Sequence, residues 1–533
     1  MEYTKAIRQS MDSVAETRND RLKTTLPRFS AEEKKAILRY YHPDYKRENF
    51  MRLSMGPNIG DKVPKELGAM LQGKSRVLGQ SIDLQNPRYD VDVLIIGGGG
   101  AGATAAIEAQ RHGAAVLMAT KLRLGDSNTG MAEGGMQAAD GPNDSPVIHY
   151  LDAIGGGHYK NDPALLKELV LSGPDALQWL TRLGVLFDRT ESGDMVRNHG
   201  GGTSRRRMHA CEDHTGAEIM RVLKDEVENL GIDVLPYSPA VELLLDTTGH
   251  IGGAVLYDFD TDEYYAVRAK SVILATGGAG RLHYQGFPTS NHYGSTADGL
   301  VLAYRVGVPL IYADAIQYHP TGAAYPPQIT GALVTEKVRS LGAMLVNCRG
   351  EAFLHPLETR DVVAAAIIRE CNAKHGGVPT QGDASAVWLD TPMIDMVHGK
   401  GTIEKQLPGM LHLYDRFGID IRKEPILVYP TLHYQNGGIC IDHHSATKIP
   451  GLFAAGEDVG GIHGKNRLMG NSLLDIIVFG RIAGTEAARY SAHASVGTLT
   501  LSHVQQFEAG RSSQAFSYTE PSPKLLPHYR WRK

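Results

Sequence analysis

Cysteine is scarce in this sequence. Its 533 residues include four cysteines, Cys211, Cys348, Cys371 and Cys440. None of them forms a CxxC pair, so the chain offers neither a zinc ribbon nor the thiolate ligands of an iron–sulfur cluster. We therefore predict no metal site, and free thiols in a reducing compartment.

Long apolar runs and a strong net charge are also missing. No stretch approaches the ~18 consecutive apolar residues that a membrane-spanning helix needs, and the first residues lack the apolar core of a signal peptide. The formal net charge is −4, which gives no reason to expect nucleic acid as a partner. We predict a cytoplasmic protein with no transmembrane segment of its own. Any attachment to the inner face of a membrane would then be made through partner subunits.

The chain is long enough for several domains. At 42% hydrophobic and 21% charged residues it has the composition of a soluble globular protein. Residues 1–88 are predicted to form a separate, helical N-terminal extension. In it, FSAEEKKAILRYY predicts a helix with a capping box from Ser30 and Glu33, ended by Pro43. Two interpretations stay open: helices packed on the main body, or an arm that docks a partner.

Glycine is concentrated just after residue 89, where the pattern becomes strand, turn, helix and strand. Gly97, Gly99 and Gly102 form GxGxxG between an apolar strand and a helix. The first glycine permits a tight turn, the second a close approach of a pyrophosphate, and the third close packing of helix on strand. Thr120 and Lys121 replace the acidic residue that usually binds the ribose, which argues against NAD more than against FAD. We predict FAD.

Two further strand–glycine segments, 269–282 and 449–484, indicate that distant pieces build one nucleotide domain. The predicted fold is α/β: a discontinuous Rossmann-like FAD-binding domain with an inserted α+β capping domain. The predicted boundaries are 1–88 for the extension, 89–315 and 433–490 for the two parts of the FAD-binding domain, 316–432 for the capping domain, and 491–533 for a tail.

An ordered set of motifs spans about residues 90–490: GGGGAG, SNTGMAEGG, ATGGAGR, HPTG, LVTE, TRDVV, HYQNGG, GLFAAGE and NRLMGNSLLD. Together they resemble the flavoprotein subunit of succinate dehydrogenase and fumarate reductase, a family that also contains L-aspartate oxidase. The resemblance implies hydride transfer between FAD N5 and a C4 dicarboxylate. Because the chain has no cysteine motif, it also implies a redox partner, most simply an iron–sulfur subunit.

The resemblance assigns roles around the dicarboxylate. Four residues match substrate-binding positions: His319, Thr335, His433 and Arg467. Arg360 matches the proton donor, and Glu336 and Arg339 match the relay that returns protons to it. An arginine acid is unusual because the pKa of its guanidinium exceeds ~12, but a relay through a carboxylate avoids a long-lived neutral arginine. Asp361 is a candidate for orienting Arg360, and the Arg205–Arg207 cluster could supply one more active-site cation.

Residues in the glycine-rich segments are implied to contact FAD. They are Gly97, Gly99, Gly102, Lys121, Ser127, Asn128, Thr129, Gly134, Gly135, Ala275, Gly277, Asp298, Glu457, Arg467, Asn471, Ser472 and Leu474. We expect Glu457 to hold ribose or ribityl hydroxyls. We expect the helix that begins near Asn471 to direct its N-terminus at the N1–O2 edge of the flavin, where negative charge develops on reduction.

Three features depart from the family. The N-terminal extension has no counterpart in common members, and the family's C-terminal helical domain is largely absent, its place taken by a tail that we predict to be an extended strap. Asn128 stands where membrane-bound members carry a histidine bonded covalently to the flavin. An amide has no nucleophilic ring nitrogen, so we predict non-covalent FAD. In the family the covalent bond accompanies easier succinate oxidation, so its absence favours fumarate reduction.

Other functions stay open at this stage. They are L-aspartate oxidase, a reductase of another α,β-unsaturated acid, and a non-catalytic flavin-bearing scaffold in an electron-transfer complex. The presence of His319, Arg360, His433 and Arg467 together argues against the scaffold. The sequence alone does not name the redox partner or the physiological direction.

Overall fold

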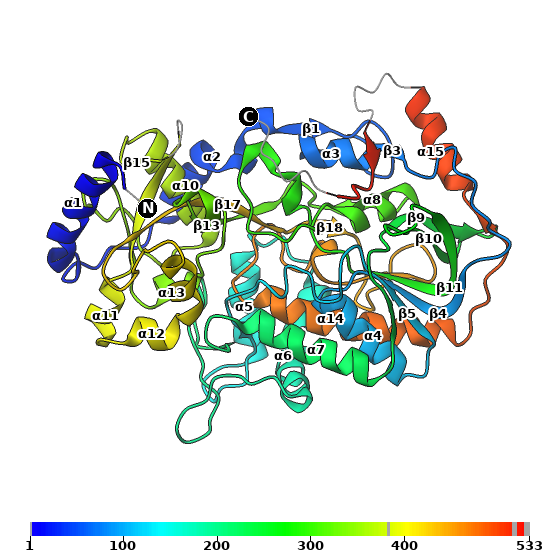
Figure 1. Ribbon diagram of the computed structural model, residues 1–533, viewed down its shortest axis with the longest axis horizontal. Helices are drawn as coiled ribbons and strands as arrows, with labels where there is room; N and C mark the ends of the chain where they lie inside the picture. Colours follow the sequence, from blue (N-terminus) through cyan, green and yellow to red (C-terminus); the bar gives the residue numbers. More distant parts are fainter. Residues whose placement is uncertain (1–2, 381–383, 514–519, 527–533) are drawn as a thin grey trace.

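The computed structural model describes residues 3–380, 384–513 and 520–526. Two sheets organise these residues, and Figure 1 shows the smaller sheet with its helices beside the larger one. Among the described helices, none combines the length and the apolar character needed to cross a membrane.

The larger sheet has eight strands, and its parallel half is assembled from segments far apart in the sequence. β4 (Tyr89–Ile96) lies between β5 (Val116–Ala119) and β11 (Tyr264–Leu274), with β8 (Asp233–Leu235) beyond β5 and β19 (Leu452–Ala454) paired with β11. Three antiparallel strands complete it: β9 (Ala240–Asp246), β10 (Ile251–Tyr257) and β20 (Leu499–Thr500). The end of β4 is fully buried, as its unbroken apolar run predicts. This sheet is the predicted discontinuous Rossmann-like unit.

The turn after β4 requires glycine at two positions. Gly97 has a φ of +123°, and a Cβ there would lie 2.1 Å from the carbonyl oxygen of Ala275. A Cβ on Gly102 would lie 2.0 Å from the carbonyl oxygen of Gly97. The strand, the turn and α4 (Gly100–Arg111) therefore pack as closely as the GxGxxG motif predicts.

A long helix from the end of the FAD-binding sequence, α14 (Asn471–Ser491), lies against α4. A Cβ on Gly480 would lie 2.9 Å from the carbonyl oxygen of Ala101, and one on Gly484 would lie 2.3 Å from that of Ala105. The two helices can approach this closely only because both positions are glycine. The start of α14 at Asn471 agrees with the predicted start.

The smaller, antiparallel sheet forms the cap. Its strands are β13 (Ile316–Ala323), β17 (Ile426–Gln435), β16 (Ser385–Asp390), β14 (Met344–Val346) and β15 (Val378–Pro379). α10 (Arg360–Asn372) packs on this sheet through Val363 and Ile367, in one apolar core with Val387 and Val428. The predicted boundary at 432/433 falls inside β17, because this strand carries the chain from the cap back to the flavin-binding part.

The remaining helices and short strands connect these layers. The helices are α5 (Pro146–Gly156), α6 (Pro163–Leu183), α7 (Thr215–Asn229), α8 (Asp298–Arg305), α9 (Glu336–Ser340), α11 (Met393–His398), α12 (Thr402–Gln406), α13 (Pro408–Asp415) and α15 (Ser502–Ser512). The strands are β6 (Met136–Gln137), β7 (Met208–His209), β12 (Leu310–Ile311), β18 (Gly438–Ile439) and β21 (Pro521–Ser522).

The N-terminal extension runs along both parts of the molecule, from α1 beside the cap to β3 beside the larger sheet (Figure 1). Its elements are α1 (Lys5–Arg21), α2 (Ala31–Tyr41), β1 (Phe50–Arg52), β2 (Lys62–Pro64), α3 (Lys65–Leu71) and β3 (Lys74–Ser75). The predicted capping box of Ser30 and Glu33 is present at the start of α2. The extension is thus less purely helical than predicted, because short strands lie before and after α3.

Specific hydrogen bonds tie the extension to both parts. Trp388 in the cap donates its Nε1–H to Ser10 Oγ at 2.7 Å. The Asn58 side chain exchanges two hydrogen bonds with the backbone of Leu310, at 2.7 and 2.8 Å. The extension therefore packs on the main body of the molecule. This agrees with the first of the two interpretations of its sequence.

The described part of the tail is extended. β21 pairs in parallel with β3, and the buried Ser522 accepts a hydrogen bond from Arg305 Nη2 at 2.6 Å. Arg305 also forms a fully buried ion pair with Glu242 at 2.9 Å. This agrees with the predicted strap for residues 520–526; positions 514–519 and 527–533 lie outside the described residues.

A buried ion pair anchors α1 to the cap and predicts a stability effect. Arg18 and Arg21 bind the fully buried carboxylate of Asp390 at 2.8 and 2.7 Å. We expect Asp390→Asn to lower the free energy of unfolding by about 3 kcal/mol, because it leaves the buried Arg21 without an anionic partner. Urea unfolding followed by tryptophan fluorescence measures this. The exposed Asp415, changed to asparagine, is the control; equal stability of the two variants would contradict the prediction.

Candidate active site

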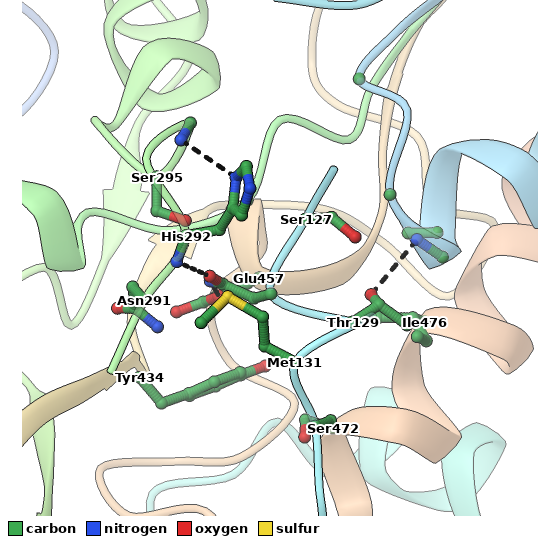
Figure 2. Close-up of a pocket in the computed structure, with 18 of the residues that line it drawn as sticks. Ser127, Thr129, Met131, Asn291, His292, Ser295, Tyr434, Glu457, Ser472 and Ile476 are labelled. Atoms are coloured by element: carbon green, nitrogen blue, oxygen red, sulfur yellow. Dashed lines mark hydrogen bonds between the residues drawn. The ribbon is translucent and has the colours of Figure 1, made fainter. Parts of the chain in front are cut away.

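A long pocket lies between the two sheets, and most of the predicted site residues line it. They are Gly97, Gly99, Lys121, Ser127, Asn128, Thr129, Gly134, Gly135, Ala275, Gly277, Asp298, His319, Thr335, Glu336, Arg360, His433, Glu457, Arg467 and Ser472. Figure 2 shows Ser127 and Thr129 across this pocket from Asn291, His292 and Ser295. Segments separated by more than three hundred residues therefore meet in one site.

Four predicted residues do not line the pocket. Gly102 packs on Gly97, and Arg339 lies behind Glu336. The Asn471 side chain bonds His149 at 2.9 Å, and Leu474 is fully buried in the core. They lie one layer away from the pocket and support the residues that line it.

One end of the pocket fits the phosphates of a dinucleotide. Gly99 precedes α4, and a Cβ there would lie 3.2 Å from Ser127 Cβ, so the glycine keeps the helix N-terminus open. Thr129 Oγ1 accepts a hydrogen bond from Gly100 N at 3.2 Å, which fixes the loop beside that terminus (Figure 2). Lys121 and Asp298 pair at 2.6 Å at the same end. These groups could hold the phosphates and the adenosine part of FAD.

Asn128 is held from both sides. Its Nδ2 donates to Glu457 Oε2 at 2.9 Å, and its Oδ1 accepts from His292 N at 2.7 Å. Burial raises the pKa of Glu457. The amide thus joins two walls of the pocket.

Arg360 is fixed by a buried carboxylate. Its Nε donates to Glu336 Oε2 at 2.8 Å, and Arg339 Nη2 lies 3.3 Å from the same oxygen. The other carboxylate oxygen accepts from Gly201 N at 2.8 Å. Burial alone would raise the pKa of Glu336, but Arg360 and Arg339 hold it below its usual value. Glu336 is therefore ionised and lies between two arginines.

Gln317 joins the two arginines of the pocket and is not among the residues predicted from the sequence. Its Oε1 accepts from Arg360 Nη1 and from Arg467 Nη2, both at 3.0 Å. Its amide nitrogen donates to the backbone oxygen of Arg467 at 2.7 Å. A signal was available: Gln317 precedes His319 by two residues on β13, and alternate residues of a strand share one face.

Two histidines face each other beside these arginines. The rings of His319 and His433 lie 5.1 Å apart between centroids. Burial, then the nearby Arg360, lowers the pKa of each well below its usual value, so both are neutral near pH 7. His319 Nδ1 accepts from Thr321 N at 3.3 Å, which leaves the proton on Nε2. His433 Nδ1 is held by Ser290 Oγ at 2.8 Å.

Arg467 is buried, as are Arg360 and Arg339. Its Nη1 donates to Ser472 Oγ at 2.5 Å, and the guanidinium carbon lies 4.4 Å from the ring centroid of Tyr434. Burial, with Arg360 nearby, lowers its pKa to about 9. Its Nε is buried and has no hydrogen-bond partner in the described part of the chain. Buried arginine donors and neutral histidine donors suit a small carboxylate dianion.

Two expectations about flanking residues are corrected. Asp361 pairs with His158 at 3.0 Å, and it is Glu336 and Gln317 that orient Arg360. In the Arg205–Arg207 cluster, Arg207 is buried against Asp144 and Asp152 at 2.7 and 2.6 Å. None of the three arginines is among the described residues that line the long pocket.

Known proteins that resemble this chain define the class of enzyme to which it belongs. The family described as FAD binding domain matches residues 92–473. The chain is 41% identical to a fumarate reductase (CoM/CoB) subunit of Methanothermobacter marburgensis, over 77% of this chain and 75% of that protein. It is 37% identical to the L-aspartate oxidase of Streptomyces coelicolor, over 76% and 70% of the two chains. The class is that of FAD-dependent oxidoreductases.

A solved structure agrees with this assignment. The FrdA protein of quinol fumarate reductase from E. coli superposes with a TM-score of 0.72 at 31% identity, covering 80% of this chain and 74% of that one. The protein belongs to the family of fumarate reductase and succinate dehydrogenase flavoprotein subunits and L-aspartate oxidase. It is an FAD-dependent oxidoreductase of the fumarate reductase/succinate dehydrogenase type.

Proposed function

We propose that this chain is the flavoprotein subunit of a fumarate reductase/succinate dehydrogenase-type complex, with Arg360 as the proton donor. The observation that carries the proposal is the position of Arg360. It is held by Glu336 and Gln317, in a pocket that also contains His319, His433 and Arg467. Such a group of donors offers a C4 dicarboxylate charge and hydrogen bonds where water is largely excluded.

Each residue has a role in this proposal. Arg467 and the Nε2–H of His319 bind the substrate carboxylates, with His433 and Thr335 beside them. Arg360 delivers a proton to the olefinic carbon, and Glu336 returns one to it with Arg339 behind. Bound FAD would supply the hydride. Glu457 and the loop from Ser127 to Thr129 would hold FAD, with the N-terminus of α14 at the flavin.

We also propose that FAD binds without a covalent bond to the protein. The Asn128 amide has no nucleophilic nitrogen, and both of its ends are already hydrogen-bonded. We expect acid precipitation of the purified protein to leave the flavin in the supernatant, measured by its fluorescence. Flavin that stays with the washed precipitate would contradict this. Free FAD added to an unrelated protein and carried through the same steps controls for trapped flavin.

Electrons are proposed to pass through an iron–sulfur partner. Relatives such as the M. marburgensis protein are named as subunits of larger enzymes, and the cysteines described in this chain are free. We propose a cytoplasmic location, with any contact to the inner face of a membrane made through partner subunits. The absence of a covalent flavin bond favours fumarate reduction as the direction.

A dye assay tests the proposal. The FAD-loaded protein is mixed with a reduced viologen dye, and fumarate is added; we expect fumarate-dependent oxidation of the dye. No oxidation with flavin present would refute the first function. The L-aspartate oxidase relative at 37% identity makes that activity the second candidate. Oxaloacetate or ammonia formed from L-aspartate would favour it, and dye oxidation by another unsaturated acid alone would favour a different reductase.

A further inference from the structure

A second cavity, of about 860 Å³, lies beside the active site. It is lined by Asp361 and Asn466, the sequence neighbours of Arg360 and Arg467. Another wall is formed by the N-terminal extension between Leu38 and Lys62. That wall lies outside the family match, which begins at residue 92. Cavities of this size hold small organic ligands.

The lining of this cavity carries excess positive charge. Five cationic side chains line it: Arg47, Arg52, Lys62, Lys160 and Lys465. The acidic residues are Asp44, Asp314 and Asp361. Burial raises the pKa of Asp44 well above its usual value, which favours its neutral form. The cations therefore outnumber the ionised carboxylates near neutral pH.

The acids that remain ionised are already paired. Asp314 lies 3.1 Å from Lys465 and 3.7 Å from Lys62, and Asp361 lies 3.0 Å from His158. Arg47 and Lys160 are exposed and form no ion pair with any residue of the described chain. The positive charges of these two side chains are therefore not neutralised at the edge of the cavity. They attract anions into a cavity with low-dielectric walls.

A buried histidine also lines this cavity. His42 is 3% exposed, and its Nδ1 accepts from Asp44 N at 3.3 Å, so its proton lies on Nε2. Within the described residues, that Nε2 is buried and has no hydrogen-bond partner. Buried donors in native proteins normally have an acceptor. Leu38, Phe50 and Ile316 add an apolar surface to the same cavity.

We propose that this cavity binds an organic polyanion, whose carboxylate or phosphate groups bind at Arg47 and Lys160 and whose body lies against the apolar wall. This site is distinct from the substrate pocket, since it is a different cavity. It contacts the wall that contains Asn466, whose Oδ1 accepts from Gln317 Nε2 at 3.0 Å. Gln317 in turn accepts hydrogen bonds from Arg360 and Arg467, so one side chain connects the wall of this cavity to the active site.

Direct binding tests the proposal on the oxidised, FAD-loaded protein. Citrate and inorganic pyrophosphate are titrated separately by calorimetry, with excess succinate present to occupy the dicarboxylate site. We expect one molecule bound per chain. Tighter citrate binding identifies carboxylates as the recognised groups, and tighter pyrophosphate binding identifies phosphates. Because no turnover is needed, failure of the dye assay would leave this result unaffected.

Variants assign the binding to this cavity. Arg47→Glu with Lys160→Glu should weaken binding at least tenfold, whereas the matched change Lys167→Glu, on the exposed side of α6, should leave it unchanged. The thermal unfolding midpoint of the double variant is measured to show that the protein is folded. Failure of both probes to bind, or equal binding by the double variant and the wild type, overturns the proposal.

Discussion

Replacing Arg360 by lysine is expected to lower fumarate-dependent dye oxidation by about 10⁴-fold, the upper range for loss of a general acid. Lysine keeps the positive charge but cannot direct one nitrogen at Glu336 and another at Gln317, as the guanidinium does at 2.8 and 3.0 Å. The lysine ammonium would then be out of position for proton transfer. The relay through Glu336 would not return a proton to it. Steady-state dye oxidation, normalised to bound flavin, measures the loss.

A matched substitution on the same helix distinguishes loss of proton donation from loss of packing. Arg369 lies on the same helix as Arg360, and its guanidinium carbon lies 5.8 Å from the ring centroid of Phe29, not in the pocket. Arg369→Lys should keep turnover close to that of the wild type. If Arg360→Lys kept full turnover with the flavin bound, Arg360 would not be the proton donor.

Replacing Glu336 by glutamine is expected to reduce turnover by about 10²- to 10³-fold, since the amide cannot return a proton to Arg360. The same change leaves Arg339, which is fully buried, without its anionic partner. We expect the free energy of unfolding to fall by about 3 kcal/mol for this reason. Urea unfolding and flavin content are measured together with activity. Glu191→Gln, in an exposed loop, serves as the control.

The pH dependence of stability has a definite sign at Glu336. Its pKa in the folded protein is held below its usual value by Arg360 and Arg339. Its ionised form therefore stabilises the fold above the unfolded pKa, and this contribution is lost as the pH falls through the folded pKa. Between pH 7 and pH 4 the wild type should lose more stability than Glu336→Gln. Equal losses for the two proteins would contradict the assigned shift.

Local features of the fold could be predicted because they depend on short-range sterics and periodicity. Gly97 and Gly102 are required wherever a strand, a tight turn and a helix pack this closely, so the motif predicts the geometry. The capping box at Ser30 follows in the same way from local hydrogen bonding. α14 begins at Asn471, directly after Gly470, whose φ is +85°. The short strands after α2 were missed, because three-residue runs carry no clear period.

Part of the candidate site could also be predicted from the sequence, and part of it could not. His319, Arg360, His433 and Arg467 are found by motif order, and the structure brings all four into one pocket. Gln317 was missed and Asp361 was given the wrong partner, since a side chain's neighbours across the fold are not encoded by its place in the chain. Asp361 follows Arg360 directly, yet on α10 consecutive side chains point about 100° apart, and Asp361 reaches His158 instead.

The sequence by itself determined the class of fold, because glycine turns, strand periodicity and motif order are properties of short segments. Through the family resemblance it also predicted the cofactor and the residues expected in the site. Only the tertiary structure decided which charges meet: Glu336 between two arginines, Gln317 joining Arg360 to Arg467, and a cationic cavity beside the N-terminal extension. The physical reason is that burial and electrostatic interaction depend on distances through space, and residues far apart in the chain set those distances only once it has folded.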